Sequence, residues 1–459
     1  MAEPATTART VDAGASIPAA SGNALFRRRL RTWAGILSAY FSTQTVTQLL
    51  GIAAGLLFIR NMPMEQFALY TLATSVITFF AFVTDLGSTT SLVHFFRRAA
   101  EEGDDFHRYL QAVLSLRRVA FLVGAVVVVV ALPVVARAKG FAGMEVGLTT
   151  ASVVLAVGLQ IVAAVRQLAL RLHGGFGRSY RADLSGGAVR LALAAAMVAG
   201  AILHSWLAVL TAAAASMVTA WTAGSVDANQ SATHAVGSSQ DLVPYRRAVL
   251  RYLLPTLPSA FYFALQGPLI VWLAAAFGAS RNIAEVGALG RLGLVVGMFS
   301  GLTGIVFMPR LARIHDDRLL RTRVLQFGAV HLTLAAMLLT AAWMVPGPFL
   351  WLLGPHYAGL HRELLMVVAG SGLSLLGGYT VSINLSRCWT RWETLAALVM
   401  AVSQAVAVGL LPMATTTGVL TFNLLSSAIG LALQLIVVTL GFHRPGWVLW
   451  NIRTTYRDN

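Results

Sequence analysis

Runs of about 20 apolar residues, with almost no charge inside them, recur along this chain of 459 residues. A helix of that length spans the roughly 30 Å hydrocarbon core of a bilayer. Only 11% of the residues are charged, whereas an average soluble domain carries about 25%. The runs therefore predict an all-α, polytopic membrane protein and exclude a water-soluble globular fold.

Twelve runs can be counted, six on each side of a long polar stretch at residues 225–247. They fall at about 33–59, 67–96, 119–136, 147–165, 188–204, 206–225, 249–277, 283–308, 324–345, 364–386, 394–412 and 418–441. The polar stretch is the predicted linker between two six-helix lobes, residues 27–224 and 248–442. Residues 1–26 are rich in small and polar types, which predicts a disordered tail, and residues 443–459 form a second tail.

The basic residues support the same map. When the N-terminus is placed in the cytoplasm, 28 of the 34 Lys and Arg residues lie on the cytoplasmic side. Cytoplasmic loops of membrane proteins are enriched in these residues. The pattern predicts that both termini and the linker are cytoplasmic, and it accounts for the net charge of +16 without a nucleic-acid partner.

Enzyme motifs do not occur in this sequence. It contains no HExxH, GxSxG or GxxxxGK[ST] pattern. The single cysteine, Cys388, excludes an intramolecular disulfide and a cysteine-based metal cluster. We expect a protein that is not an enzyme, with no catalytic residue, no metal and no cofactor.

The eighth span carries a seam of glycines. Its six glycines, which include Gly293, Gly297 and Gly301, fall within about 120° of arc on a helix. Such a seam lets two helix backbones approach closely in lipid, so we expect a packed contact that is either static or able to slide. Arg291 lies about 100° from the centre of the seam. It either snorkels to the interface or lines a wet cavity that binds an anionic substrate.

Other polar residues within or beside spans are further candidates for substrate binding. Gln44 and Gln48 share a stripe of the first span, Arg60 lies at its outer end, and Gln266 belongs to the seventh span. Hydrogen bonding between helices is the competing explanation for the glutamines. Asp85, near the inner end of the second span, is either paired with an arginine or part of a proton or cation relay.

Three prolines mark the seventh span as a bent or hinged helix. They are Pro255, Pro258 and Pro268. Proline removes a backbone hydrogen bond and kinks a helix when it lies in the interior.

Three stretches of the chain, together with the twelve-span plan, resemble a known family. They are FALYTLATSVITFFAFVTDLGSTTSLVHF at 67–95, LALRLHGGFGRSYRADL at 168–184 and WLLGPHYAGLHRELL at 351–365. They are similar to the polysaccharide exporters of the MOP superfamily, the Wzx-like flippases. Arg291 falls where that family tends to have an arginine in its eighth span.

Individual residues carry this resemblance. Tyr70, Asp85 and Gly87 match the aromatic and Asp-Leu-Gly elements of the family's second span. The outer motif before the tenth span is matched by Leu353, Gly354, Tyr357 and Ala358, and His356 replaces the acidic residue often found there.

The resemblance implies two six-helix lobes around a cationic cavity in a bacterial inner membrane. Such a protein flips or exports an undecaprenyl-pyrophosphate-linked oligosaccharide by alternating access, driven by a substrate gradient or by coupling to H⁺ or Na⁺. Polysaccharide polymerases are implied as partners. Arginine suits bidentate contact with pyrophosphate.

Two other functions remain open. A MATE-like multidrug or cation antiporter has the same helical plan, but its cationic substrates favour buried carboxylates, and Asp85 is the one acidic residue predicted well inside a span. A membrane glycan polymerase or ligase requires a large outer loop. The longest predicted outer loop, residues 346–363, is short for an active site.

The topology leads to a labelling prediction. After Cys388→Ser, a cysteine introduced as Gly237→Cys in the linker should react with an impermeant maleimide only when the membrane is permeabilised, because the charge bias places the linker in the cytoplasm. Labelling of intact cells at this position would overturn the twelve-span map.

Overall fold

The computed structural model describes residues 43–85, 91–92, 95, 106–172, 174–224, 242–254, 257–302, 311, 314, 316–387, 389 and 391–444. Within these residues the chain is helical and contains no strand. Ten helices are long and apolar enough to cross a membrane. The first and eighth predicted spans correspond to the helical residues 43–61 and to helix α10 (Ser280–Leu302). The expected all-α, polytopic fold is therefore confirmed.

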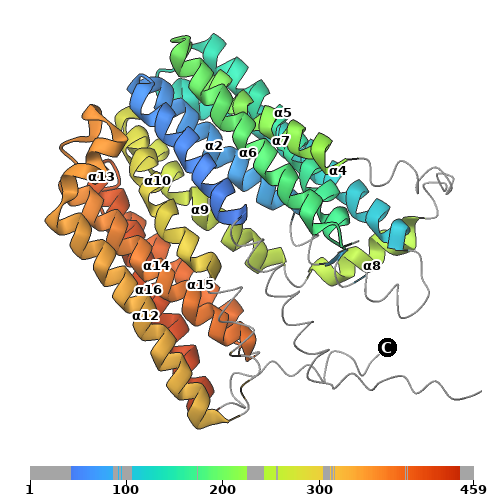
Figure 1. The fold of residues 1–459 in the computed structure, drawn as a ribbon, viewed down its shortest axis with the longest axis vertical. Coiled ribbons are helices and arrows are strands. Elements are labelled where there is room, and N and C mark those ends of the chain that lie inside the picture. Colours follow the sequence, from blue (N-terminus) through green and yellow to red (C-terminus); the bar gives the residue numbers. More distant parts are fainter. Residues whose placement is uncertain are drawn as a thin grey trace, which may run out of the picture. The chain divides into compact units, whose positions relative to one another are not determined.

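The N-terminal half, residues 43–224, contains the helical segment 43–61 and five further long helices (Figure 1). These are α2 (Met64–Asp85), α4 (Phe106–Ala138), α5 (Gly143–Leu172), α6 (Phe176–Ala199) and α7 (Ser205–Ala223). Helix α7 packs between α5 and α6, and α2 lies along α5. Small residues allow this close packing, since a Cβ atom on Gly186 of α6 would overlap Thr219 of α7.

The C-terminal half, residues 242–444, begins with the short helix α8 (Val243–Leu253), which packs on α4. Its other helices are α9 (Leu257–Phe277), α10, α12 (Asp317–Met344), α13 (Pro346–Leu353), α14 (His361–Ser386), α15 (Glu393–Leu410) and α16 (Thr416–His443). Helix α14 packs between α12 and α16. Asn384 of α14 donates a hydrogen bond to the Gln434 side chain of α16 at 2.7 Å.

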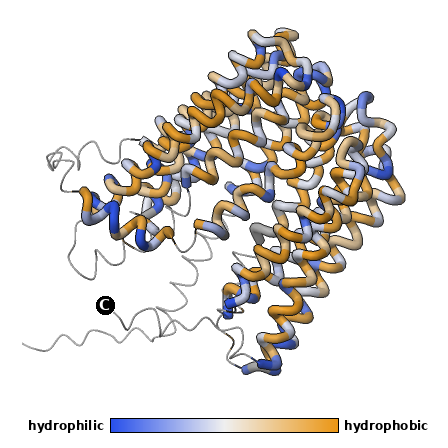
Figure 2. The backbone as a smooth tube through the Cα atoms, turned by 180° about the vertical axis from the view of Figure 1, so that it is seen from behind, coloured by the Kyte–Doolittle hydropathy of each residue, from blue (hydrophilic) through white to orange (hydrophobic). Residues whose placement is uncertain are grey.

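Exposed apolar side chains occur along α4 and α12, and Figure 2 shows long hydrophobic stretches along the helices. Val126 of α4 is 66% exposed and Leu325 of α12 is 73% exposed. Large contiguous apolar patches are rare on soluble monomers. These faces are suited to contact with lipid chains.

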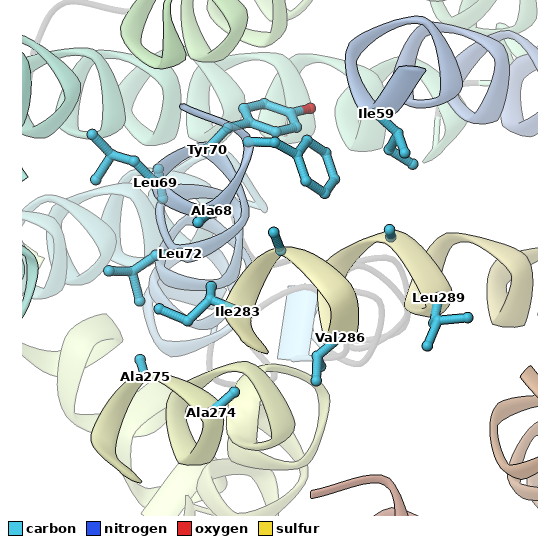
Figure 3. Packing of buried hydrophobic residues seen from close by; sticks show 14 of the residues in the cluster. Ile59, Ala68, Leu69, Tyr70, Leu72, Ala274, Ala275, Ile283, Val286 and Leu289 are labelled. Carbon is cyan, nitrogen blue, oxygen red and sulfur yellow. The ribbon is translucent and has the colours of Figure 1, made fainter. Parts of the chain in front are cut away.

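The two halves meet where α2 packs against both α9 and α10. Figure 3 shows Ile283 and Val286 of α10 in the same apolar cluster as Leu72 of α2 and Ala274 and Ala275 of α9. The small alanines bring the helix backbones close together, which is the main source of helix association in lipid.

Two hydrogen bonds add to this contact between the halves. Trp272 Nε1 of α9 donates to Ser75 Oγ of α2 at 3.0 Å. Lys139, in the turn after α4, donates to the carbonyl oxygen of Gly278 at 2.7 Å. Direct polar contact therefore joins the halves at a few points around an apolar centre.

The glycine seam of α10 is packed over only part of its length. A Cβ on Gly287 would overlap Thr71 of α2, and one on Gly293 would lie 2.9 Å from Ser371 Oγ of α14. A Cβ on Gly290 or on Gly297 would meet no neighbouring helix within 4 Å, so these two glycines face open space. Gly301 lies at the end of α10, and Gly304 is outside the described residues. The expected packed seam is thus corrected to two separate contacts, because different glycines meet different neighbours or none.

The prolines of the seventh span also differ from one another. Pro268 lies inside α9 and is buried, as expected for a proline that interrupts helix hydrogen bonding. Pro258 is the second residue of α9, where a proline fits the first turn without a kink. Pro255 is outside the described residues. The expected bend is therefore restricted to Pro268 among the described prolines of this span.

Gly287 and Gly297 provide a matched test of this packing. Gly287→Leu should destabilise the protein by about 1 to 3 kcal/mol, because the new side chain overpacks the contact with Thr71. Gly297→Leu adds the same side chain to the same helix where space is open, and should change stability little. Thermal unfolding of the purified variants measures both, and equal melting temperatures for the two would contradict the assigned α2–α10 contact.

Candidate functional site: a cavity between the halves

A cavity of about 850 Å³ lies between the two halves. From the N-terminal half it is lined by the segment 43–61 and by α2, α5, α6 and α7. From the C-terminal half it is lined by α9, α10, α14 and α16. A space of this size accommodates a small organic ligand.

Two arginines, one from each half, meet at this cavity. Arg190 of α6 donates a hydrogen bond from a terminal guanidinium nitrogen to the Tyr70 hydroxyl at 3.2 Å. Arg291 of α10 places its guanidinium carbon 5.7 Å from the centre of the same tyrosine ring. Both arginines line the cavity. Tyr70 is fully buried in α2, so the two arginines are gathered around one buried side chain.

Gly55 makes room for Arg291. A Cβ at Gly55 would lie 3.3 Å from a guanidinium nitrogen of Arg291, so a larger side chain would crowd the arginine. Within the described residues, neither Arg190 nor Arg291 forms an ion pair with an acidic side chain. An arginine inside a membrane is costly unless it pairs, snorkels or faces water. The arrangement favours the cavity-lining role over snorkelling for Arg291.

Several buried polar atoms around this cavity have no hydrogen-bond partner. They are Thr47 Oγ1, Thr71 Oγ1 and Arg190 Nε. Buried polar groups are normally satisfied by protein or water. These three atoms are exceptions to that rule, and all three belong to residues that line the cavity.

One carboxylate belongs to the residues that line the cavity. Asp183 of α6 accepts hydrogen bonds from Gln167 at 2.5 Å and from Arg171 at 3.0 Å, both of α5. Arg171 also donates to Ser179 at 2.8 Å. The carboxylate is thus neutralised by its own arginine and held in a fixed orientation, and it leaves Arg190 and Arg291 uncompensated.

The glutamines and Arg60 predicted to bind substrate lie away from the lining of this cavity. Gln44 is half-buried and Gln48 is exposed on the segment 43–61, where Thr47 and Gly51 line the cavity instead. The guanidinium of Arg60 lies over the ring of Trp351 in α13, 4.4 Å from its centre.

Gln266 has a structural partner. It exchanges two hydrogen bonds with Gln404, at 2.7 and 3.1 Å, and so joins α9 to α15. This is the interhelical bonding that the sequence left open as the alternative to substrate contact. Gln266 does not line the cavity, although the neighbouring Gly267 and Pro268 do.

Asp85 forms an ion pair with Arg117 of α4. Arg117 is almost completely buried, whereas Asp85 is partly exposed at the end of α2. The pairing alternative for Asp85 therefore has direct structural support, and a proton or cation relay through this residue stays a hypothesis.

The outer motif of the tenth span forms a compact turn. Gly354 has a φ of +106°, which a residue with a side chain adopts only with strain. Tyr357 follows in a short 3₁₀ turn and is buried. Burial, followed by the nearby charge of Glu285, raises the pKa of the Tyr357 hydroxyl. The loop predicted at 346–363 is thus mostly occupied by α13 and this turn.

Sequence reasoning missed Arg190 and two acidic residues. It counted Arg190 on the cytoplasmic side, at the beginning of the span predicted at 188–204, whereas the residue lies well inside α6. Asp183 also lies in α6, and Glu285 of α10 is buried beside Thr416 and Arg281. The sequence predicted Asp85 as the one acidic residue well inside a span. This prediction is wrong, because Asp183 and Glu285 also lie within long helices. The spacing of Asp183 and Arg190, seven residues apart on one helix face, is the signal that would have placed both on the cavity.

With this geometry, comparison with known proteins defines the fold class: the chain has the polytopic membrane fold of the solved structures of MurJ and of MATE family proteins. The structure "Lipid II flippase MurJ, inward closed conformation" matches with a TM-score of 0.69 at 13% identity, covering 87% of this chain and 87% of that one. An inward-facing multidrug resistance MATE family transporter matches with a TM-score of 0.59 at 15% identity, covering 86% and 95%.

A crystal structure of MATE in complex with MaD3S matches with a TM-score of 0.56 at 17% identity, covering 89% of this chain and 94% of that one. No protein-family model matches the chain, and no curated protein sequence does. At these identities the likeness establishes the fold, and the narrower resemblance to polysaccharide exporters stays a prediction.

The ion pair of Asp85 allows a double-variant test of its role. Asp85→Asn should lower the amount of folded protein, because it removes the carboxylate that compensates the buried guanidinium of Arg117. Adding Arg117→Gln should restore much of that loss, since the buried charge that needs compensation is gone. Abundance and transport of the single and double variants in membranes measure the effect. Loss of transport in Asp85→Asn alone, at normal abundance, would instead assign Asp85 to ion coupling.

Proposed function

We propose that the chain is a transporter that moves a lipid-linked oligosaccharide, joined to its lipid through a pyrophosphate, across the membrane. The observation that carries this proposal is the meeting of Arg190 and Arg291, from opposite halves, at one cavity without an acidic partner among the described residues. Alternating access between two halves is the mode of transport that such a central site serves.

Pyrophosphate suits this pair of arginines. Each guanidinium presents two parallel N–H donors that match two phosphate oxygens, and the charges of donor and acceptor reinforce the bonds. Tyr70 occupies the position between the arginines. Its hydroxyl accepts a hydrogen bond from Arg190, a contact that a bound anion would replace.

The walls of the cavity also suit an amphipathic substrate. Besides Arg291, Ser371 and Asn423, the C-terminal half contributes glycines, Pro268 and apolar side chains. These apolar side chains are Ile270, Val271, Val286, Leu294, Val367 and Leu420. A polar head group therefore has hydrogen-bonding partners mainly on the N-terminal side of the cavity.

The wider setting follows from the same proposal. The substrate is the undecaprenyl-pyrophosphate intermediate of surface polysaccharide synthesis, and the protein resides in a bacterial inner membrane with both termini in the cytoplasm. Coupling to H⁺ or Na⁺ and cooperation with a polysaccharide polymerase belong to this proposal and need their own tests.

Export of cationic drugs is the second candidate function. The solved MATE structures share the fold, and Asp183 lines the cavity. Asp183 is engaged by Arg171, however, so the uncompensated charge of the cavity is positive. Efflux of ethidium from cells that contain the protein distinguishes the two functions, and strong efflux that Asp183→Asn abolishes would favour the antiporter.

Arg291 provides the direct test of the anion site. Arg291→Lys should reduce transport by about tenfold or more, because lysine keeps the charge but not the planar pair of donors. Arg291→Ala should lose nearly all transport. A merely snorkelling arginine would tolerate lysine. Complementation of a flippase-deficient strain, read together with membrane abundance, is the measurement.

The matched control is Arg362→Ala, which removes an exposed arginine at the beginning of α14, outside the cavity lining. It should complement as the native chain does. Full complementation by Arg291→Ala at normal abundance would remove this residue from the site and contradict the proposed anion carrier.

A further inference from the structure

The short helix α8 lies beside one end of α4 (Figure 1) and is fixed there by one of its faces. Val249 is fully buried and Leu253 is 6% exposed, and both belong to an apolar cluster shared with α4. Beside them, Arg246 donates a hydrogen bond to Ser115 of α4 at 2.7 Å. These contacts set the rotation of α8 about its own axis, so its opposite face has a defined direction.

The opposite face of α8 is exposed and carries two arginines. Arg247 and Arg251 are four residues apart, which makes them neighbours on one side of the helix. Exposed apolar side chains border them, at Val243, Leu250 and Leu254. At 100° per residue these five positions fall within about 100° of arc. An exposed helix face that combines arginines with apolar side chains is typical of helices that lie in the interface of a membrane.

The contact with α4 places α8 at the boundary of the apolar belt. Ser115, which accepts the bond from Arg246, shares one face of α4 with Val119, Leu122 and Val126. These three apolar side chains are 60%, 63% and 66% exposed. The first of them follows Ser115 by about one helical turn, or roughly 6 Å. Helix α8 therefore lies at the level where lipid head groups meet the acyl chains.

The two arginines have no carboxylate to compensate their charge. Helix α8 contains no acidic residue, and neither Arg247 nor Arg251 forms an ion pair within the part of the chain that the structure describes. Arg118 of α4, also exposed, adds a third positive charge three residues after Ser115. Like charges four residues apart on a helix repel each other. An anion bound at this face would relieve that repulsion.

We propose that the exposed face of α8 is a binding site for an anionic phospholipid. The phosphate of the head group bridges the guanidinium groups of Arg247 and Arg251, and an acyl chain lies along Leu250 and the apolar face of α4. Basic side chains at a membrane surface attract anionic lipids in preference to zwitterionic ones. No residue of α8 lines the central cavity, so this site does not depend on the proposed function.

Thermal stability of the full chain tests this site. The protein in dodecyl maltoside is heated with dioleoyl phosphatidylglycerol or with dioleoyl phosphatidylcholine, and unfolding is followed by tryptophan fluorescence. A ligand that binds only the folded state raises the melting temperature, so phosphatidylglycerol should raise it by about 2 °C or more relative to phosphatidylcholine. High salt should reduce the difference, since exposed charges are screened. Equal melting temperatures in the two lipids would overturn the site.

Variants of the two arginines locate the effect. Arg247→Gln combined with Arg251→Gln should remove most of the stabilisation by phosphatidylglycerol. In phosphatidylcholine this double variant should be at least as stable as the native chain, because the repulsion on α8 is gone. A lower melting temperature there would show that the arginines have a partner in the protein and would contradict the site. Arg247→Lys with Arg251→Lys keeps both charges and should retain most of the lipid effect.

The matched control is Arg137→Gln combined with Arg362→Gln. It removes the same charge from exposed positions at the other end of α4 and at the beginning of α14. The control should respond to phosphatidylglycerol as the native chain does, and an equal loss in the control would assign the effect to net charge rather than to α8.

Glycerol 1-phosphate separates a lipid site from a site for a soluble anion. It carries the phosphate without acyl chains, so at the concentration of the lipid it should leave the melting temperature unchanged. Stabilisation as large as that by phosphatidylglycerol would show that the apolar face of α8 takes no part in binding, and would overturn the assignment to a phospholipid.

Discussion

The arrangement of the inner helices depends on keeping two arginine side chains inside a membrane protein. A charged side chain near the bilayer centre costs a few kcal/mol on insertion scales unless it is hydrated or paired. Arg190 and Arg291 avoid this cost by facing a cavity rather than lipid. The hydroxyl of Tyr70 accepts a bond from Arg190 on one side, and the absence of a side chain at Gly55 leaves room for Arg291 on the other. Small residues around the cavity therefore have two roles: they make room for an arginine side chain, as Gly55 does, and they allow helices to pack closely, as Gly186 does.

The contact between the halves has a different physical character. Lipid provides little hydrophobic drive for helix association, so α2 is held to α9 and α10 by close packing of small apolar residues and a few hydrogen bonds. Each polar contact is worth only about 1 kcal/mol. A contact of this kind can be exchanged for another arrangement at modest cost, as alternating access between two halves requires.

The sequence predicts the helical plan well because the apolar runs and the bias of positive charge both report on the bilayer. It locates Arg291 because an arginine inside an apolar run is conspicuous. It places Arg190 at the cytoplasmic end of a span, because the apolar run starts at about residue 188 whereas α6 begins at Phe176. A helix that lines a cavity carries polar residues on one face. Hydropathy therefore shortens this helix, which leaves Asp183 outside the predicted span and Arg190 at its edge.

Periodicity has a second limit, which Gln266 illustrates. A helical pattern shows which residues share a face, but it does not show what lies opposite. The partner of Gln266 is Gln404, 138 residues away, and only the packing of α9 against α15 brings them together. The same limit applies to the glycines of α10: one narrow arc contains Gly287, which is packed against Thr71, and Gly297, which faces open space.

The two arginines of the cavity belong to different halves. Arg190 comes from α6 and Arg291 from α10, so an anion held by both arginines links the halves directly. A ligand shifts a conformational equilibrium only through contacts that differ between the states. Contacts with one half alone persist when the halves change their relative arrangement. A phosphate that bridges the two arginines gains or loses one of its contacts instead. Under the proposed function, the anion is therefore the part of the substrate whose binding controls the conformational change.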